Sequence, residues 1–402
     1  MVMTQRIAVL GATGSIGDST LAILAAQPQH YDVYALSGYH RLDKLLALCE
    51  QFAPKRVSVP TAAVDEFAKR LSIAGLDTEV VGGETGLVDI ATDSQTDTVV
   101  AAIVGAAGLP STLAAARAGK RILLANKEAL VMAGQVMINA VKTHHATLLP
   151  LDSEHNAIFQ CLPFAIQQDN TQIHRPNHGV RKLWLTASGG PFLQQSFTQM
   201  QQASVAEAVK HPNWSMGQKI SVDSATMMNK GLELIEACHL FDLPENKINV
   251  VIHPQSIIHS MVEYSDGSFL AQLGSPDMKT PIAHALSYPD RIDSGSQPLD
   301  LFALSGLEFI EPDLQKFACL RLAREAMQAG THATIILNAA NEIAVAAFLN
   351  NQIRLTDIAD INEQALNEIQ VSALTETADI DEILAIDNLA RQHTEKLVAR
   401  LI

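Results

Sequence analysis

Short apolar runs alternate with amphipathic stretches through the first 150 residues. The apolar runs lie at residues 6–10, 32–37, 56–59, 79–81, 97–105, 121–125 and 146–151. Stretches with a helical period separate them, for example at 42–52, 62–71 and 128–142. This alternation predicts a parallel β-sheet with helices on both faces, so residues 1–150 are expected to form one α/β domain.

The pattern changes after residue 151. Apolar runs at 180–187, 250–253, 257–264 and 268–273 predict strands, and Ser265-Asp266-Gly267 between the last two is typical of a β-hairpin. Residues 170–179 are polar, contain Pro176 and are predicted to form a loop. We therefore expect a second, central α/β domain at 151–290, whose sheet need not be parallel.

The remainder of the chain divides into a linker and a helical part. Residues 291–312 include the turn-forming run 294–298 and are predicted to be a linker. Helical periodicity then covers 319–328, 334–349, 355–369 and 380–401. Residues 313–402 are accordingly expected to form a small C-terminal helical bundle.

Composition and charge exclude several classes of partner. Hydrophobic residues make up 48% of the chain, as in an ordinary globular protein. The net charge of −15 disfavours nucleic acid and anionic membranes as partners, because both attract basic surfaces. The longest apolar run, 98–110, is shorter than the roughly 20 residues that span a bilayer. No targeting signal is recognisable at the N-terminus, and the cysteines lack metal-ligand spacing, so we expect reduced thiols in a cytoplasmic protein. These cysteines are Cys49, Cys161, Cys238 and Cys319.

A glycine motif follows the first predicted strand and precedes a helix. Its glycines are Gly11, Gly14 and Gly17, with Thr13, Ser15 and Ile16 among the residues between them. Glycines at this position allow a tight turn and a close approach to a pyrophosphate, which the helix N-terminus attracts. The motif predicts a Rossmann-like dinucleotide-binding domain; the alternative is a structural turn.

The end of the second strand favours NADPH over NADH. An NAD enzyme usually places a carboxylate here, but this chain has Gly38, Tyr39, His40 and Arg41. His40 and Arg41 would attract a 2′-phosphate. The alternative is that Arg41 only opens the next helix on the surface.

Two acids follow the strand at 146–151. If the chain stays extended, Asp152 and Glu154 face the same side, at a sheet edge where α/β domains place ligands. Two adjacent carboxylates need a cation, and oxygen-only ligation suits Mg²⁺ or Mn²⁺. The alternative is an acidic surface turn.

A third acid lies at the end of the run 224–233, which is taken to be a helix. Asn229 and Glu233 are four residues apart, and Lys230 and Glu233 are three apart, so the three share a face. An ammonium, an amide and a carboxylate there could bind a phosphate beside a metal. The alternative is a solvent-facing ion pair.

Three further segments offer chemistry. Ser188 in the run 186–191 follows a strand and presents a hydroxyl to an anion. The run 211–217, which contains His211 and Trp214, has no helical or strand period and is predicted to be a lid; the alternative is a static loop anchored by Trp214. Lys127 lies at the end of a strand of the first domain, where it could reach cofactor or substrate.

Together these segments resemble the 1-deoxy-D-xylulose 5-phosphate reductoisomerase family over nearly the whole chain. The resemblance rests on a set of motifs in a fixed order, at residues 11–17, 125–128, 151–155, 186–191, 211–217, 223–233 and 274–278. One departure is the run Gly38 to Arg41, where family members often carry a small residue, glycine, a basic residue and asparagine.

The resemblance implies roles for particular residues. Asp152, Glu154 and Glu233 correspond to the metal ligands, which with Lys127 and His211 make up the expected catalytic set. The implied substrate contacts are Ser153, Ser188, His211, Trp214, Ser224, Asn229 and Lys230, together with Glu154 and Glu233. The implied cofactor contacts are Gly11, Thr13, Gly14, Ser15, Ile16, Gly17, Gly38, His40, Arg41, Asn126, Glu128 and Gly217.

The resemblance also implies an activity and an assembly. The family is homodimeric and uses NADPH and a divalent metal to rearrange a phosphorylated ketose by breaking and reforming a C–C bond, and then to reduce the resulting aldehyde. Two alternatives remain at this point: a metal-independent NADPH reductase, and a protein that binds NADPH without catalysis. Loss of turnover with EDTA, and its return with Mn²⁺, would separate the first from the family activity.

Overall fold

The computed structural model describes residues 4–212, 214, 217–374 and 378–401. The chain forms two compact units. The first comprises Met1–Ala129, Met137–Asp152 and Asp277–Gln297; the second comprises Leu130–Val136, Ser153–Pro276 and Pro298–Ile402. Asn213, Ser215 and Met216 of the predicted lid lie outside the described residues.

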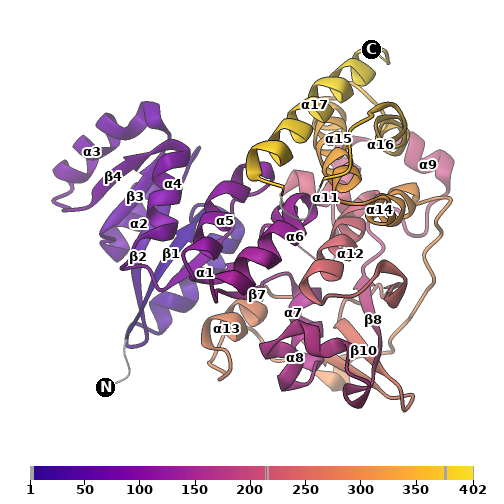
Figure 1. The fold of residues 1–402 in the computed structure, drawn as a ribbon, viewed down its shortest axis with the longest axis horizontal. Helices are drawn as coiled ribbons and strands as arrows, with labels where there is room; N and C mark the ends of the chain where they lie inside the picture. Colours follow the sequence, from indigo (N-terminus) through magenta and orange to yellow (C-terminus); the bar gives the residue numbers. More distant parts are fainter. Residues whose placement is uncertain (1–3, 213, 215–216, 375–377, 402) are drawn as a thin grey trace. The chain divides into compact units, whose positions relative to one another are not determined.

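A seven-stranded parallel sheet forms the centre of the first unit, in the order β4-β3-β2-β1-β5-β6-β7 (Figure 1). The order reverses between β1 and β5, and such a reversal is where α/β sheets bind ligands. The predicted strand at 97–105 is shorter than expected, because both neighbouring strands, β1 and β6, end opposite Ala101. The strands are β1 (Gln5–Leu10), β2 (Tyr31–Ser37), β3 (Arg56–Val59), β4 (Glu79–Gly82), β5 (Thr98–Ala101), β6 (Arg121–Leu124) and β7 (Thr147–Pro150).

Helices flank this sheet, as the alternating pattern predicts (Figure 1). They are α1 (Ser15–Ala26), α2 (Leu42–Phe52), α3 (Val64–Ile73), α4 (Gly83–Thr92), α5 (Leu109–Arg117), α6 (Lys127–Thr143) and α13 (Lys279–Ser287), with short 3₁₀ turns η1 (Thr61–Ala63) and η2 (Ala106–Gly108). The fold is therefore the expected Rossmann-like α/β arrangement.

The helix α13 joins the first unit although it comes late in the sequence. It packs against α1, β6 and β7. The guanidinium of Arg121 on β6 donates hydrogen bonds to the carbonyls of Ala285 at 2.6 Å and Tyr288 at 3.0 Å. Residues 277–297 thus group with the sheet, whereas the sequence boundaries at 150, 290 and 312 stay predictions.

The second unit contains a mixed four-stranded sheet in the order β11-β10-β8-β9. β10 is antiparallel to β8 and β11, and β8 is parallel to β9, so the sheet is not parallel throughout. The predicted hairpin joins β10 to β11. The strands are β8 (Val180–Ala187), β9 (Ile248–Ile252), β10 (Ile258–Tyr264) and β11 (Phe269–Leu273).

Two local predictions for the second unit are wrong. The predicted loop at 170–179 contains two 3₁₀ helices, η3 (Asn170–His174) and η4 (Pro176–His178). The chain is not extended from Asp152 to Glu154, because α7 begins at Ser153 and places Glu154 in its first turn. The helices here are α7 (Ser153–Cys161), α8 (Phe164–Gln168), α9 (Phe197–Gln201), α10 (Val205–Ala208), α11 (Gln218–Ala225) and α12 (Met228–Leu240), with η5 (Glu245–Lys247).

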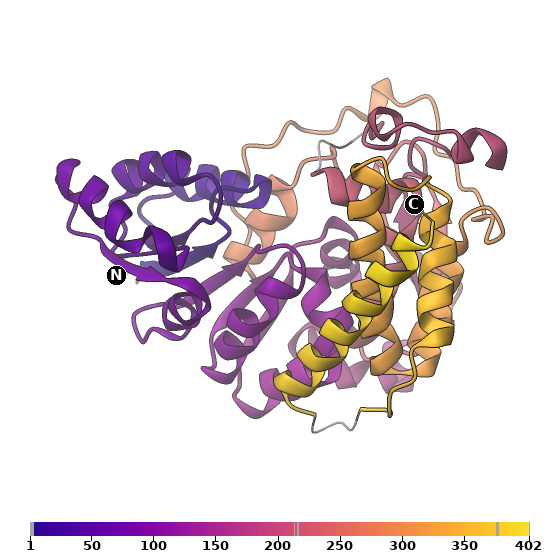
Figure 2. The ribbon, with the colours of Figure 1, turned by 90° about the horizontal axis from the view of Figure 1, so that it is seen from above.

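The C-terminal helices pack around α15, and Figure 2 shows them side by side in orange and yellow. They are α14 (Ala318–Ala329), α15 (Thr331–Leu349), α16 (Asp357–Glu368) and α17 (Ile380–Ala399), after η6 (Leu301–Ala303). Among the described residues, α15 is the one helix long and apolar enough to cross a membrane, but 72% of its apolar window is buried within the protein, as in a core helix. The four cysteines are free thiols.

We expect the half-buried ring of His239 to make stability depend on pH. His239 on α12 lies against Gly134, and burial lowers its pKa to about 4 while the charge of Asp242 partly opposes the shift. The unfolded chain binds this proton at higher pH than the folded protein does, so the free energy of unfolding should fall as pH drops from about 6.5 toward 4. Urea unfolding at several pH values should show a smaller slope for His239→Asn. Exposed His144→Asn is the control, and equal slopes in both variants would contradict this assignment.

Candidate functional site

The glycine loop is shaped for close approach to a phosphate group. Gly11 has a φ of 84°, and a Cβ there would lie 2.6 Å from the carbonyl oxygen of Ala102, so only glycine fits. Gly17 packs as closely on the backbone of Ala12. Gly14 is the N-cap of α1 and has no side chain to satisfy the first N–H groups of the helix, which can therefore bind an anion.

Two cations lie against this loop. Nη1 of Arg41 and Nζ of Lys44 each donate to the carbonyl oxygen of Thr13, at 3.3 and 3.1 Å. Arg41 is also the N-cap residue of α2, so it both opens a helix and contacts the glycine loop. No sequence pattern marks Lys44, because its ion pair with Asp18 and its contact with Thr13 both depend on tertiary packing.

Asn126 organises the exit from β6. Its side chain accepts the N–H of Ala129 at 3.1 Å as the N-cap of α6, and it donates to the carbonyl of Gly105 at 3.0 Å. The next residue, Lys127, is buried and pairs with Asp152 at 2.6 Å. The predicted catalytic lysine and the predicted metal ligand Asp152 therefore meet within the first unit.

In the second unit, a buried ammonium joins two of the predicted acids. Nζ of Lys230 lies 2.7 Å from Oε1 of Glu154 and also pairs with Glu233. Lys230 is 4% exposed and Glu233 is 2% exposed, which rules out a solvent-facing ion pair. Asn229 donates to Glu233, so the predicted helix face exists. The turn before α12, at Met227 with a φ of 60°, starts the helix so that these residues lie in its first turns.

The charges of this cluster do not balance. Burial alone lowers the pKa of the Lys230 ammonium, but the adjacent carboxylates of Glu154 and Glu233 outweigh it, so the pKa is raised and the side chain stays charged. One ammonium between two carboxylates leaves a net negative charge. This oxygen-rich, negative donor set fits a divalent cation such as Mg²⁺ or Mn²⁺. Asp152 belongs to the other unit, and its part in the ligand set stays a prediction.

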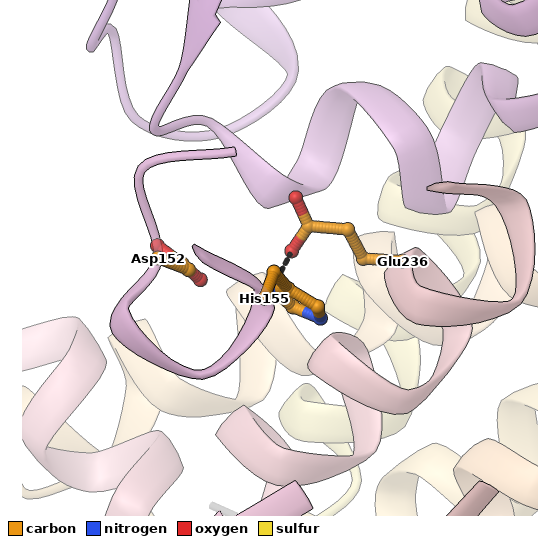
Figure 3. A group of neighbouring side chains, drawn as sticks. All are labelled: Asp152, His155 and Glu236. Carbon is orange, nitrogen blue, oxygen red and sulfur yellow. Dashed lines mark ion pairs between the residues drawn. The ribbon is translucent and has the colours of Figure 1, made fainter. Parts of the chain in front are cut away.

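A second buried pair supports the helices that carry these acids. Nε2 of His155 on α7 lies 2.8 Å from the backbone carbonyl of Glu233, and Nδ1 lies 3.2 Å from Glu236 (Figure 3). Figure 3 also shows Asp152 on the loop that leads into α7. His155 belongs to the motif at residues 151–155, but no role was predicted for it, because a contact between helices that are distant in sequence leaves no local pattern.

The predicted phosphate segments meet at Ser188. The Nδ1 atom of His211 accepts the backbone N–H of Trp214 at 2.9 Å, so a neutral ring carries its proton on Nε2, which lies 2.8 Å from the Ser188 hydroxyl. Burial lowers the pKa of His211 to about 4, although the negative charge of Glu154 partly opposes this shift. The ring is therefore neutral at pH 7. The ring of Trp214 lies 6.2 Å from His259, a residue that the sequence did not single out.

Ser224 is placed by its backbone. A Cβ on Gly190, whose φ is 66°, would lie 2.6 Å from the Ser224 carbonyl oxygen, so the glycine turn after β8 packs directly on α11. Ser153 donates to Glu154 at 2.7 Å. The structure thus brings together Ser188 with His211, and Glu154 with Lys230 and Glu233, while the ligand contacts of all of them stay predictions.

Comparisons with known proteins agree on one family. The model of 1-deoxy-D-xylulose 5-phosphate reductoisomerase matches residues 7–134, and two models of its C-terminal domains match 148–241 and 273–393. Reductoisomerases of this name from Psychrobacter cryohalolentis and Acinetobacter baylyi are 98% and 55% identical, over 100% and 99% of this chain and 100% of each relative.

Solved structures give the same result. A crystal structure of DOX-P reductoisomerase in complex with NADPH, fosmidomycin and magnesium has a TM-score of 0.97 at 60% identity, covering 99% of both chains. The Zymomonas mobilis reductoisomerase in complex with NADPH has a TM-score of 0.89 at 44% identity, covering 98% of this chain and 99% of that one.

Gly11→Ala should damage the glycine loop far more than an equivalent change elsewhere. The new Cβ would meet the Ala102 backbone in addition to straining the left-handed conformation, at a cost of about 1–3 kcal/mol. Gly75→Ala is the matched control, because Gly75 has a φ of 73° with open space around it. NADPH titration and thermal unfolding of both variants test this. Equal loss of NADPH affinity in the two would show that the close approach at Gly11 is unimportant.

Proposed function

The chain belongs to the 1-deoxy-D-xylulose 5-phosphate reductoisomerase family, and from this we propose which of its residues perform the family reaction. It is an NADPH- and magnesium-dependent enzyme that converts 1-deoxy-D-xylulose 5-phosphate to 2-C-methyl-D-erythritol 4-phosphate in isoprenoid biosynthesis. The observation that carries the assignment is the buried cluster in which Lys230 joins Glu154 and Glu233.

We assign the metal to Asp152, Glu154 and Glu233. When bound, magnesium supplies Lewis acidity at the substrate carbonyl and its neighbouring hydroxyl, and NADPH supplies the hydride. Glu154 and Glu233 come from two helices locked together by His155, so their separation is fixed before substrate arrives. Mn²⁺ is expected to support the reaction too, because it accepts the same oxygen ligands.

We assign the phosphate of the substrate to Ser188, Ser224, Asn229 and Lys230. The Nε2 proton of neutral His211 points to the Ser188 hydroxyl and could donate to a phosphate oxygen instead. Binding this non-reacting end supplies energy that positions the reacting end. His211 and Trp214, which share a hydrogen bond, would cover the bound ester and retain the aldehyde intermediate.

The reacting end is assigned to Lys127 and Ser153. The ammonium of Lys127 pairs with Asp152, and Ser153 is the next residue in the chain. If Asp152 holds the metal, Lys127 and Ser153 both lie close to the substrate carbonyl. The ammonium can hydrogen-bond an oxygen that gains negative charge as the C–C bond breaks.

The cofactor is assigned to the glycine loop and its neighbours. Gly11, Gly14 and the first turn of α1 would hold the pyrophosphate, and Arg41 and Lys44, which contact the glycine loop, would hold the 2′-phosphate. The remaining proposed contacts are Thr13, Ser15, Ile16, Gly17, Gly38, His40, Asn126, Glu128 and Gly217. A cytoplasmic location agrees with the free thiols.

A homodimer is proposed from an apolar surface on the second unit. β11 ends the four-stranded sheet and exposes Phe269, Leu270 and Leu273. An edge strand with exposed apolar side chains is a template for pairing with a second copy.

Glu233→Gln should abolish turnover and change the dissociation constant of NADPH by less than about twofold, because the glycine loop belongs to the other unit. Calorimetry should show that magnesium binding is lost, and EDTA should inactivate the wild type until Mg²⁺ or Mn²⁺ is returned. Exposed Glu325→Gln serves as control. Normal turnover, or NADPH affinity that falls together with it, would be inconsistent with the assigned metal site.

Lys44→Ala and Arg41→Ala should each weaken NADPH binding by roughly tenfold and affect NADH binding much less, because NADH lacks the 2′-phosphate that these cations are proposed to hold. Fluorescence titration with both nucleotides measures this without turnover. Arg70→Ala, which removes a surface cation paired with Asp43, is the control. A similar loss for both nucleotides would refute the assignment.

Leu270→Lys combined with Phe269→Lys should convert the protein to a monomer in sedimentation experiments, because two charges replace apolar area at the proposed interface. Exposed Ile73→Lys on the first unit is the control. A wild-type protein that sediments as a monomer, or a double variant that remains dimeric, would overturn the proposed interface.

A further inference from the structure

A buried carboxylate lies next to the phosphate segment and has no part in the proposed chemistry. Asp223 on α11 is 1% exposed, one residue before Ser224. A buried carboxylate is costly unless it is paired and hydrogen-bonded. Its retention at this position calls for an explanation.

Asp223 is held from two directions. Its Oδ2 lies 2.9 Å from Nζ of Lys219, one turn earlier on α11. Its Oδ1 accepts a hydrogen bond of 2.8 Å from the amide of Asn341 on α15. Lys219 of the same helix thus compensates the charge of Asp223, while α15, which comes much later in the sequence, fixes the position of its side chain.

The chain of contacts continues into the C-terminal helices. Nδ2 of Asn362 on α16 donates to Oδ1 of Asn341 at 3.3 Å, and both asparagines are fully buried. The series Asp223, Asn341, Asn362 therefore links α11, α15 and α16 through side-chain hydrogen bonds. Because a buried polar group must keep its partner, these contacts fix the register of the three helices against one another.

Ser224 is oriented by the same helix. Successive residues on a helix point about 100° apart, so Asp223 can face the C-terminal helices while Ser224 faces elsewhere. On another side, the carbonyl of Ser224 is in contact with Gly190, in the turn that follows Ser188. α11 is thus fixed between the glycine turn and the asparagine series.

We propose that Asp223, held by Asn341 and Asn362, is a positioning residue that sets where α11 presents Ser224 to the substrate phosphate. The inference rests on the assignment of Ser224 to the phosphate in the proposed function. It gives the C-terminal helices, which contribute no proposed substrate contact, a role in substrate affinity.

The test compares buried asparagines of the C-terminal helices α15 and α16. Asn341→Ala should raise KM for 1-deoxy-D-xylulose 5-phosphate roughly tenfold, with a smaller change in kcat and an unchanged NADPH dissociation constant. Asn362→Ala, one contact further from Ser224, should act in the same direction more weakly, and it keeps the test available if Asn341→Ala fails to fold. Asn338→Ala is the matched control: Asn338 is equally buried on α15, but its amide contacts Glu342.

A double-mutant cycle separates positioning from general destabilisation. Ser224→Ala should raise KM, and adding Asn341→Ala should then have little further effect, because both changes remove the same interaction. Equal KM values for the Asn341 and Asn338 variants, or effects that multiply fully in the double variant, would overturn the inference. If Ser224→Ala leaves KM unchanged, the phosphate assignment itself is wrong, and the inference is lost with it.

Discussion

Two carboxylates from different helices lie together inside the second unit because a single ammonium lies between them. Glu154 and Glu233 would repel each other in a buried site, and burial would discharge an isolated Lys230. The ammonium stabilises the charge of both carboxylates, and they stabilise the charge of the ammonium. The cluster still carries excess negative charge, which favours the binding of a divalent cation.

The surrounding fold serves to keep this arrangement rigid. His155 links α7 to the backbone of α12 at Glu233, so Glu154 and Glu233 lie close together without a bound metal. The glycine turn at Gly190 holds α11 closely from one side. In the first unit, by contrast, no side chain caps the first turn of α1 after Gly14, and we propose that its backbone N–H groups bind the pyrophosphate of the nucleotide.

Local sequence patterns predict a large part of this architecture. The period-3.6 spacing of Asn229, Lys230 and Glu233 places them on one helix face, and the strand-glycine-helix order locates the glycine loop at the start of α1. The prediction for Asp152 and Glu154 is wrong in its conformation, because a short strand ending and a helix start have similar apolar patterns in so few residues.

Contacts between distant segments are not predictable in this way. His155 with Glu236, and Asp223 with Asn341, pair residues on separate helices, and nothing near either residue in the sequence marks the partner. Lys44 is missed for a related reason, since its contact with the glycine loop depends on how α2 packs beside β2.

Anomalous diffraction from crystals grown with Mn²⁺ tests the central claim most directly. The account predicts one strong manganese peak about 2.1 Å from a carboxylate oxygen of both Glu154 and Glu233, with the Lys230 ammonium turned away from it. A peak bound elsewhere, or an intact contact of Lys230 with both acids at saturating manganese, would contradict it.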